Sequence, residues 1–569
     1  MKKNDDVQEK LKRFDKKLLL WQVLAFILAG ILIVWLFLIQ VVDIKHYKEK
    51  AKRQRNAQGF VLRGEIFDRN GEKLASNKQS FNVYAHPGDY IHEPDELAEK
   101  LAPVLGISYN KLVRQLKQQH KIILVKKDVD RQTAIKVRRL GLREISLDRK
   151  NERVYPQGKM AAHVLGYYNP DAETAAGVEL KQNKILETPS HISEYEKTPN
   201  GDVIYELLTN LEDTINPVKG QPVQLTINNG IQHVCESELN KMITERKALR
   251  GGIIVIEPKT GEILGYAVYP NYDPNNYKKA TALQIKNWTL TDVYPPGSTF
   301  KVLTLAAGLE SGKINEHSRI NDSGKMKIGG WTLKNYDYSI RPYPGDIDLY
   351  YLLEHSSNVA SARIALMMDR QEYYNILKRF GIGSKTGIDL PGESSGLLPD
   401  YRNWQESDKA SMGYGYGAST TFIQMASIMA GIANGGVKIT PHVIKYSEEE
   451  LPQHVKQEVI MSPETAATMA KLLAGSVGHS KTPVNLKTYT VAAKTGTSLK
   501  PKENGKGYTN FNYTSVMGFF PAYDPQVMIY VVIDSAQGPA VWGNTIASPV
   551  FKEVALQVAR ILNIKPDKV

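Results

Sequence analysis

A long apolar run near the start of the chain limits its architecture more than any other feature. Leu18 to Val42 is almost unbroken in apolar residues, and only Gln22, Gln40 and small residues interrupt it. At the rise of an α-helix, about 1.5 Å per residue, such a run can cross a bilayer. It is longer than the apolar core of a signal peptide, and no convincing small-x-small cleavage site follows it. The sequence therefore predicts an uncleaved transmembrane helix at residues 18–42.

Charges beside this run predict its orientation. The basic residues that precede it are Lys10, Lys12, Arg13, Lys16 and Lys17. Because basic residues favour the cytoplasmic side, residues 1–17 are expected to form a cytoplasmic tail. Six further basic residues between 45 and 55 weaken the contrast, so charge alone leaves the opposite orientation open. No second comparable apolar run follows, and the rest of the chain is expected on one side, outside the plasma (inner) membrane or in the periplasm.

Composition divides this remainder into two parts. The segment Asn216–Pro222, which contains two prolines and a glycine, marks a boundary between a domain at 43–216 and another at 217–569. In the first part, helical patterns are expected at 95–119 and 130–140. In the second, the expected elements are a helix at 231–244, a hairpin at 252–268, helices at 359–368 and 421–434, strands at 489–493, 515–520 and 527–533, and a closing helix at 549–562. This order predicts an α/β (α+β) fold in which a mainly antiparallel sheet is flanked by helices.

Charge and cysteine content exclude several functions. Lys and Arg number 73 against 60 Asp and Glu, a net charge of +13, but the basic residues are spread along the chain and match no nucleic-acid-binding motif. This balance suits a surface beside anionic lipid or wall polymer. Cys235 is the only cysteine, so no intramolecular disulfide can form. His163 has no partner at ligand spacing and is expected to be a structural hydrogen-bonding residue. Neither a metal nor a cofactor is predicted.

The stretch Tyr294–Lys301, Tyr-Pro-Pro-Gly-Ser-Thr-Phe-Lys, is the first candidate for chemistry. Two prolines and a glycine stop the preceding element, and apolar residues at helical spacing follow as far as Ser311. On such a helix Ser298 and Lys301 lie on one face. A serine hydroxyl needs an adjacent base, and burial or a second cation can lower the pKa of a lysine enough to serve. Alone the motif is weak, because Ser108 to Lys111 also fits it and is expected to be a helix cap.

Two further motifs strengthen the catalytic interpretation. Ser356-Ser357-Asn358 is a Ser-x-Asn, and Lys494-Thr495-Gly496 is a Lys-Thr-Gly. Lys-Thr-Gly occurs three times: the copy at Lys259 falls in the expected hairpin turn, and the copy at Lys385 falls in a loop. Only Lys494 follows a strand-like run, and it is therefore the copy chosen. Ser-x-x-Lys, Ser-x-Asn and Lys-Thr-Gly in this order are the active-site set of penicillin-binding proteins and serine β-lactamases.

With these motifs the chain resembles a class B penicillin-binding protein, a membrane-anchored peptidoglycan D,D-transpeptidase. The resemblance covers nearly everything after the apolar run. Its N-terminal pedestal, the dimerisation-type domain, is matched by Arg63-Gly64-x-Ile66-x-Asp68-Arg69-Asn70-Gly71, Leu74-Ala75, Arg153, Tyr155-Pro156, His163 to Gly166 and Gly177 to Glu179. The order of these matches is more specific than any one of them.

The resemblance implies acyl transfer in two halves. Ser298 would attack the carbonyl between the two terminal D-alanines of a stem peptide, while Lys301 accepts its proton. Backbone N–H groups of Ser298 and Thr497 would hold the oxyanion. Ser356 would pass a proton to the departing D-alanine with the help of Lys494, whose charge also keeps Lys301 neutral.

The remaining motif residues are implied in substrate binding. Asn358 would hydrogen-bond the substrate amide and Lys301. Thr495 and Thr497 would bind the terminal carboxylate, and Gly496 would let the edge strand approach the substrate. An acceptor amine on a neighbouring stem peptide would then resolve the acyl-enzyme. β-Lactams would acylate the same serine.

Within the family, two features point to different branches. Met412 to Gly417 and Ser356-Ser357-Asn358 resemble the septal, cell-division branch, whereas Tyr294 to Gly297 is more typical of the elongation branch. The septal branch is preferred, with partners among divisome proteins and a polytopic septal glycosyltransferase that supplies new glycan strands. A homodimer is left open. Small residues Ala25, Ala29 and Gly30 would permit close helix packing in the membrane.

Rival interpretations fit less well. A serine β-lactamase carries the same motifs but is a smaller exported domain, and a β-lactam sensor typically adds a His-Glu-x-x-His motif that this sequence lacks. A catalytically inactive divisome scaffold is the third alternative, and the intact motifs oppose it.

Overall fold

A computed structural model describes residues 21, 27–32, 56–58, 61–169, 172, 174–188, 194–196, 218–502 and 507–568. Among these residues, no helix has both the length and the apolar character needed to cross a membrane. Most of the predicted membrane segment, 18–42, lies outside the described residues, as does the predicted domain boundary at 216–217.

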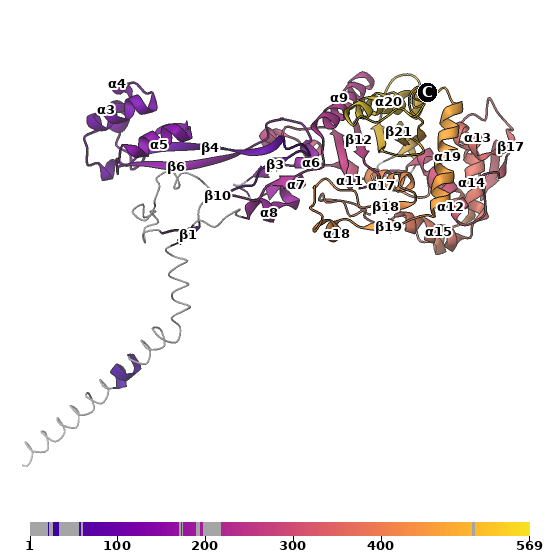
Figure 1. Ribbon diagram of the computed structural model, residues 1–569, viewed down its shortest axis with the longest axis horizontal. Helices are drawn as coiled ribbons and strands as arrows, with labels where there is room; N and C mark the ends of the chain where they lie inside the picture. The colour runs from indigo at the N-terminus through magenta and orange to yellow at the C-terminus, as the bar shows by residue number, and fades with distance from the viewer. Residues whose placement is uncertain are drawn as a thin grey trace, which may run out of the picture. The chain divides into compact units, whose positions relative to one another are not determined.

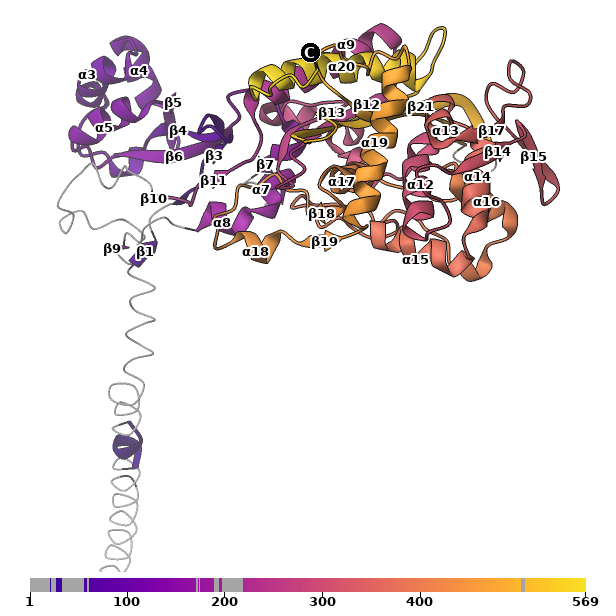
Figure 2. The same cartoon turned by 45° about the vertical axis from the view of Figure 1, so that its right-hand side comes forward.

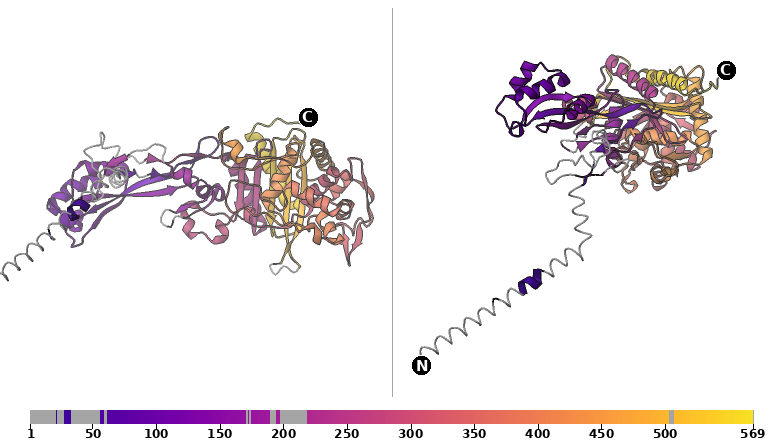
Figure 3. Two further views of the ribbon diagram at one scale, coloured as in Figure 1. Left: turned by 90° about the horizontal axis from the view of Figure 1, so that it is seen from below. Right: turned by 60° about the vertical axis from the view of Figure 1, so that its left-hand side comes forward.

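Contacts divide the chain into two compact units. One is built around Ser80–Lys150, with short strands from 56–62 and 194–219. The other combines Arg63–Gln79, Asn151–Thr188 and Gln221–Val569. The long strands β4 (Lys73–Ala85) and β6 (Ile145–Val154), which pair with each other, contribute residues to both units (Figures 1 and 3).

The first unit packs three helices on paired strands. Its elements are β1 (Asn56–Gln58), β2 (Val61–Leu62), η2 (Pro87–Asp89), α3 (Pro94–Leu105), α4 (Tyr109–Leu116), β5 (Ile123–Val129), α5 (Arg131–Arg139), β9 (Glu194–Glu196) and β10 (Val218–Lys219). Apolar side chains of α3, α4, α5, β4 and β5 form its core. The predicted helix at 95–119 is in fact two helices, because Gly106 ends α3 in the left-handed conformation (φ 62°) and Ser108 precedes α4. Ser108 therefore stands at a helix N-cap position, although its side chain makes no capping hydrogen bond.

The second unit contains a five-stranded antiparallel sheet. Its strands, in spatial order, are β13 (Ile263–Tyr269), β12 (Arg250–Ile256), β22 (Val527–Asp534), β21 (Tyr508–Phe520) and β20 (Ala492–Pro501). The predicted hairpin at 252–268 forms β12 and β13. Strand β20 pairs only with β21, so it is an edge of the sheet.

Alternating side chains give this sheet two buried faces. On β22, Val527, Ile529, Val531 and Ile533 enter one core, whereas Met528, Tyr530 and Val532 enter the other. Because successive residues of a strand point to opposite faces, a strand buried on both sides is apolar throughout. The unbroken apolar run at 527–533 follows from this position in the middle of the sheet.

Helices cover both faces, as predicted. Helices α9 (Asn229–Arg246) and α20 (Gly543–Ile561) lie together on one face, and α17 (Phe422–Ala433) packs on the other (Figures 1 and 2). Helix α19 (Pro463–His479) packs on α17 and also contacts α12 (Lys301–Glu310) and α13 (Leu349–His355). Helix α12 contacts α14 (Asn358–Met367) and α15 (Arg370–Phe380), and α14 contacts α16 (Glu406–Gly413). The prediction of a mainly antiparallel sheet flanked by helices is confirmed.

Shorter elements complete the second unit. They are β3 (Ile66–Phe67), α6 (Ala162–Leu165), β7 (Tyr168–Asn169), β8 (Thr174–Ala175), α7 (Gly177–Lys181), α8 (Asn183–Glu187), β11 (Val223–Gln224), η4 (Pro274–Lys279), α10 (Ala282–Ile285), α11 (Trp288–Thr291), η5 (Gly297–Phe300), β14 (Arg319–Asp322), β15 (Lys325–Ile328), β16 (Trp331–Lys334), β17 (Gly345–Asp348), η6 (Tyr401–Asn403), β18 (Val437–Ile439), α18 (Leu451–His454) and β19 (Gln457–Val459).

The pedestal motifs converge on a buried carboxylate in this unit. Glu179 binds Arg63 at 2.5 Å and Arg153 at 2.7 Å and accepts a hydrogen bond from the Tyr155 hydroxyl at 3.2 Å. All four side chains are buried, so each arginine compensates a charge that would be costly to leave unpaired. His163 is also buried and hydrogen-bonds the Gln284 carbonyl at 2.8 Å, consistent with the structural role expected for it.

Candidate active site

Ser298 lies in a single 3-10 turn, η5, that leads directly into α12. The preceding Gly297 has a positive φ of 58°, and a Cβ there would come within 2.7 Å of the Ser498 Cβ. Glycine is therefore required both by the backbone conformation and by the approach of strand β20. This contact brings the nucleophile candidate against the edge of the sheet.

Lys301 joins the Ser-x-x-Lys and Ser-x-Asn motifs. Its Nζ lies 3.1 Å from the Ser298 Oγ, 3.0 Å from the Ser356 Oγ and 2.8 Å from the Asn358 Oδ1. It also donates to the Ser356 carbonyl oxygen at 2.5 Å. The side chain is fully buried. A lysine in this position can exchange a proton with either serine hydroxyl without moving.

The electrostatic surroundings favour the neutral form of Lys301. Burial, followed by the positive charge of Lys494, lowers its pKa well below the ordinary value, and Asp322 and Asp337 oppose this shift. Burial also lowers the pKa of Lys494 to about 8. Since a neutral amine is a base and an ammonium is not, these shifts suit Lys301 to accept the Ser298 proton.

A buried network missed by sequence reasoning positions the Ser-x-Asn motif. The Asn335 amide oxygen accepts the backbone N–H of Asn358 at 2.9 Å and of Val359 at 3.1 Å. The Asn335 Nδ2 donates to both carboxylate oxygens of Asp322, at 3.0 and 2.9 Å, and the Ser357 hydroxyl donates to the same carboxylate at 2.6 Å. Asp322, Asn335 and Ser357 are buried.

This network acts at the two-residue link between α13 and α14. Ser356 has a positive φ of 54°, which is unusual for a residue other than glycine. Helix α14 begins two residues later, and its first backbone N–H groups are the ones that Asn335 satisfies. Asn335 thus fixes the backbone that carries Asn358.

The Lys-Thr-Gly motif lies within the edge strand. The apolar pattern predicts a strand at 489–493, with Lys494 just after its end. In the structure strand β20 begins at Ala492 and runs to Pro501, so Lys494 stands near its start. The residues after Lys494 are polar because one side of the strand faces a cleft, and they therefore lack the apolar pattern from which a strand is predicted. Gly496 is required for space, since a Cβ there would come within 2.6 Å of the Ser515 Oγ and 2.9 Å of the Thr299 Cγ2.

Two contacts hold the outer part of β20. The Thr497 hydroxyl accepts the backbone N–H of Gly543, the first residue of α20, at 3.0 Å. The Leu499 backbone N–H donates to the Tyr416 hydroxyl at 2.9 Å. Tyr416 comes from the glycine-rich segment 412–417, which therefore forms part of the wall beside the edge strand.

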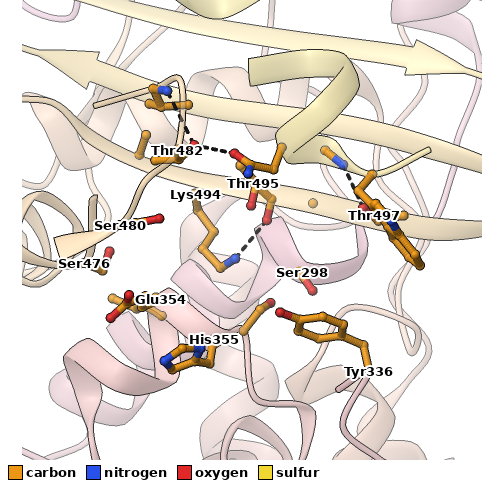
Figure 4. Close-up of a pocket in the computed structure, with 18 of the residues that line it drawn as sticks. Ser298, Tyr336, Glu354, His355, Ser476, Ser480, Thr482, Lys494, Thr495 and Thr497 are labelled. Carbon is orange, nitrogen blue, oxygen red and sulfur yellow. Dashed lines mark hydrogen bonds between the residues drawn. The ribbon is translucent and has the colours of Figure 1, made fainter. Parts of the chain in front are cut away.

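A cleft of about 650 Å³ opens above these residues. Ser298, Ser356, Asn358, Lys494, Thr495, Gly496 and Thr497 all line it. Figure 4 shows Ser298, Lys494 and Thr497 around this opening, with Tyr336 on one side and Glu354 and Ser476 on the other. Lys301 lies beneath it, buried. The described residues contain no group of three or more His, Cys, Asp or Glu side chains that could hold a metal.

The other copies of the motifs lie elsewhere. Lys259 is exposed on the turn between β12 and β13 and binds Asp524 at 3.0 Å. In the loop copy, the Thr386 hydroxyl and backbone N–H both donate to Glu393, and Lys385 does not line the cleft. Every site residue predicted from the sequence therefore lies at the cleft or, for Lys301, directly beneath it. The Lys-Thr-Gly copies at Lys259 and Lys385 lie elsewhere.

Comparison with known proteins defines the family. The chain matches the family model "Penicillin binding protein transpeptidase domain" over residues 251–556 and "Penicillin-binding Protein dimerisation domain" over residues 60–225. It is 29% identical over 553 residues to the probable peptidoglycan D,D-transpeptidase PenA of Neisseria meningitidis, covering 96% of this chain and 92% of that protein. It is also 29% identical over 558 residues to the peptidoglycan D,D-transpeptidase FtsI of Escherichia coli, covering 96% and 90%.

A solved structure shares the fold. Penicillin Binding Protein 2X from Streptococcus thermophilus superimposes with a TM-score of 0.73 at 22% identity, over 90% of this chain and 81% of that one. The chain belongs to the penicillin-binding proteins, and within them to class B, the peptidoglycan D,D-transpeptidases. It is accordingly a serine-type acyltransferase.

Proposed function

We propose that this D,D-transpeptidase cross-links stem peptides at the division septum through an acyl-enzyme on Ser298. The observation that carries the assignment of the nucleophile is the Lys301 Nζ, buried and within hydrogen-bond distance of the Ser298 Oγ, the Ser356 Oγ and the Asn358 Oδ1. Neither Lys259 nor Lys385, the lysines of the other Lys-Thr-Gly copies, lines the cleft.

Acylation begins with proton transfer from Ser298 to Lys301. The Ser298 Oγ forms a bond to the carbonyl carbon between the two D-alanines, and the backbone N–H groups of Ser298 and Thr497 stabilise the oxyanion. The C–N bond then breaks, and Ser356 delivers the proton from Lys301 to the amine of the departing D-alanine. The Lys494 charge keeps Lys301 available as a base.

Substrate binding falls to the remaining motif residues. Asn358 binds the donor amide, and the hydroxyls of Thr495 and Thr497 bind the terminal carboxylate. The close packing at Gly496 keeps the edge strand near Ser298. An acceptor amine then attacks the ester carbonyl and releases Ser298. β-Lactams, which carry a strained amide and a carboxylate, acylate the same serine in this proposal.

The septal role rests on resemblance within the family. Ser356-Ser357-Asn358 and Met412 to Gly417 support the division branch, and the second segment places Tyr416 at the cleft. Tyr294 to Gly297 supports the elongation branch, which is the alternative. In the proposal the chain is anchored by residues 18–42 with its N-terminus in the cytoplasm, and its catalytic unit acts outside the plasma membrane.

The proposed partners follow from the chemistry. Cross-links are useful only on newly polymerised strands, so a polytopic septal glycosyltransferase and other divisome proteins are expected to work beside this enzyme. The segment matched as a dimerisation domain, 60–225, and the membrane helix are the surfaces proposed for these contacts.

Depletion of the protein in its own cells tests the septal role. Unseptated, elongated cells are expected, because elongation continues while septal cross-linking stops. Complementation by wild type but not by Ser298→Ala is expected in addition. Rounded cells on depletion would assign the enzyme to elongation, and complementation by Ser298→Ala would mean that the required activity is not this acyl transfer.

A further inference from the structure

The cleft has two chemically different ends along strand β20. Near Leu499 it is aromatic, because Tyr416 and Trp542 line it there. Near Lys494 it is lined by Glu354 and by the hydroxyls of Ser476 and Ser480. In Figure 4, Glu354, Ser476 and Ser480 lie on the side of Lys494 that faces away from Thr497. A transpeptidase binds two substrates, a donor and an acceptor stem peptide, and therefore needs two binding regions.

We place the donor at the first end of the cleft, near Leu499, and this assignment rests on the proposed function. With the terminal D-alanine carboxylate bound at Thr495 and Thr497 and the scissile carbonyl at Ser298, the rest of the donor is taken to extend towards Leu499. Departure of D-alanine then empties the end near Lys494. The acceptor amine must reach the ester carbonyl from this emptied side.

Glu354 is the group at this end that can select an acceptor. It stands in the last turn of α13, and its side chain is exposed to the cleft. Among the described residues that line the cleft it is the only carboxylate, and no hydrogen bond or salt bridge joins it to another described residue. Burial and Arg341 lower the pKa of the neighbouring His355, and the charge of Glu354 opposes this shift. By contrast Glu316, whose Oε1 also accepts from Tyr350 of α13, is paired with Lys471 at 2.5 Å.

We infer that the Glu354 end of the cleft is the acceptor subsite and that Glu354 binds the ammonium group of the acceptor stem peptide. A carboxylate that forms no salt bridge with a described residue is complementary to a primary ammonium, and the hydroxyls of Ser476 and Ser480 can accept its other N–H groups. The preferred acceptor is an amine with no carboxylate on the same carbon, because Glu354 would repel that carboxylate.

The chemistry of the second half-reaction balances with these residues. The bound ammonium loses one proton to solvent and becomes a neutral amine. Its nitrogen forms a bond to the ester carbonyl carbon, the bond from that carbon to the Ser298 Oγ breaks, and the second proton passes through Lys301 to the Ser298 Oγ. Glu354 only positions the amine and takes no part in the proton transfers.

Partition of the acyl-enzyme tests the inference. The full chain in detergent is acylated with an N-acyl-D-alanyl thioester in the presence of N-acetyl-lysinamide, whose side-chain amine is cationic and has no neighbouring carboxylate. The ratio of amide product to hydrolysed product is measured for wild type and for Glu354→Gln. We expect the ratio to fall about five- to tenfold, the range of one charge-assisted contact. Hydroxylamine, which is uncharged at neutral pH, should show no comparable fall.

Controls separate this inference from the proposed function. Glu464→Gln removes one exposed carboxylate from the first turn of α19, outside the cleft, and should leave the ratio at the wild-type value. Glu354→Lys, which repels the ammonium, should lower the ratio further than Glu354→Gln. Labelling with a fluorescent penicillin verifies that each variant is folded and acylated.

Three outcomes would overturn the inference. An unchanged ratio in Glu354→Gln would show that the acceptor ammonium does not bind there. An equal fall in Glu464→Gln would show a general effect of charge, and an equal fall with hydroxylamine would show damage to the acyl-enzyme. Failure of the wild-type chain to react with penicillin or thioester would instead refute the proposed function.

Discussion

Replacement of Asn335 by alanine should weaken both the stability and the acylation of the enzyme. Asn335 lies 23 residues before Asn358 in sequence yet accepts its backbone N–H, and it bridges that segment to the Asp322 carboxylate. The substitution removes one acceptor from two backbone N–H groups and two donor contacts from a buried carboxylate. Its Oδ1 and Nδ2 have no counterpart in an alanine side chain.

The size of the effect follows from these contacts. A buried polar group left without a partner costs about 1–3 kcal/mol, so two orphaned N–H groups reduce the free energy of unfolding by about 2–6 kcal/mol. Relaxation of the loop would also move Asn358 and Ser356 relative to Lys301. A misplacement of about 1 Å in an active site can cost about a hundredfold in rate.

Urea unfolding and the rate of penicillin labelling measure the two effects. Asn321→Ala is the matched control, because Asn321 is the neighbour of Asp322, is exposed and hydrogen-bonds only on the surface, to Asp346 and Tyr343. It should change the free energy of unfolding by less than about 0.5 kcal/mol. Wild-type stability and labelling in Asn335→Ala would refute the positioning role of this network.

Three other predictions concern the lysines and the membrane topology. Lys494→Ala should slow acylation far more than Lys259→Ala or Lys385→Ala, because only Lys494 lines the cleft; equal rates in all three would mean that the wrong copy was chosen. Acylation should fall at low pH as Lys301 becomes protonated. This acid limb of the pH profile should move to higher pH in Lys494→Ala, because the Lys494 charge lowers the Lys301 pKa. It should move to lower pH in Asp322→Asn, because the Asp322 charge raises the Lys301 pKa. Shifts of the same sign in both variants would contradict this electrostatic account. Protease added to intact spheroplasts should digest the catalytic unit, and protection of that unit would overturn the proposed topology.

The elements with strong local patterns could be predicted from the sequence. The hairpin at 252–268, the strand at 527–533 and the helix at 421–434 carry apolar runs or turn signals, and each forms within a few residues of its predicted bounds. The extent of strand β20 is harder to predict, because Lys494 to Ser498 carry lysine, glycine and hydroxyl side chains along an edge that faces the cleft. Functional edges give weak hydrophobic patterns since one side must bind a polar substrate.

The candidate site could be predicted only where short motifs carry it. Ser298, Lys301 and Lys494 stand in motifs whose order is informative, so the sequence predicts them without knowledge of distances. Asp322 and Asn335 belong to no such motif, and nothing in the sequence around them indicates that their side chains meet beside Asn358. Contacts between residues so far apart along the chain depend on tertiary structure, which local patterns do not encode.

The site of covalent attachment tests the central claim most directly. The full chain is incubated with a penicillin and digested, and the modified peptide is identified by mass spectrometry in wild type and in Ser298→Ala. We predict one adduct, on Ser298, and none in the folded Ser298→Ala variant, because of the two hydroxyls within reach of the Lys301 Nζ, those of Ser298 and Ser356, only that of Ser298 lies in the turn that leads into α12. An adduct on Ser108 or Ser356, or one that persists in Ser298→Ala, would contradict the account.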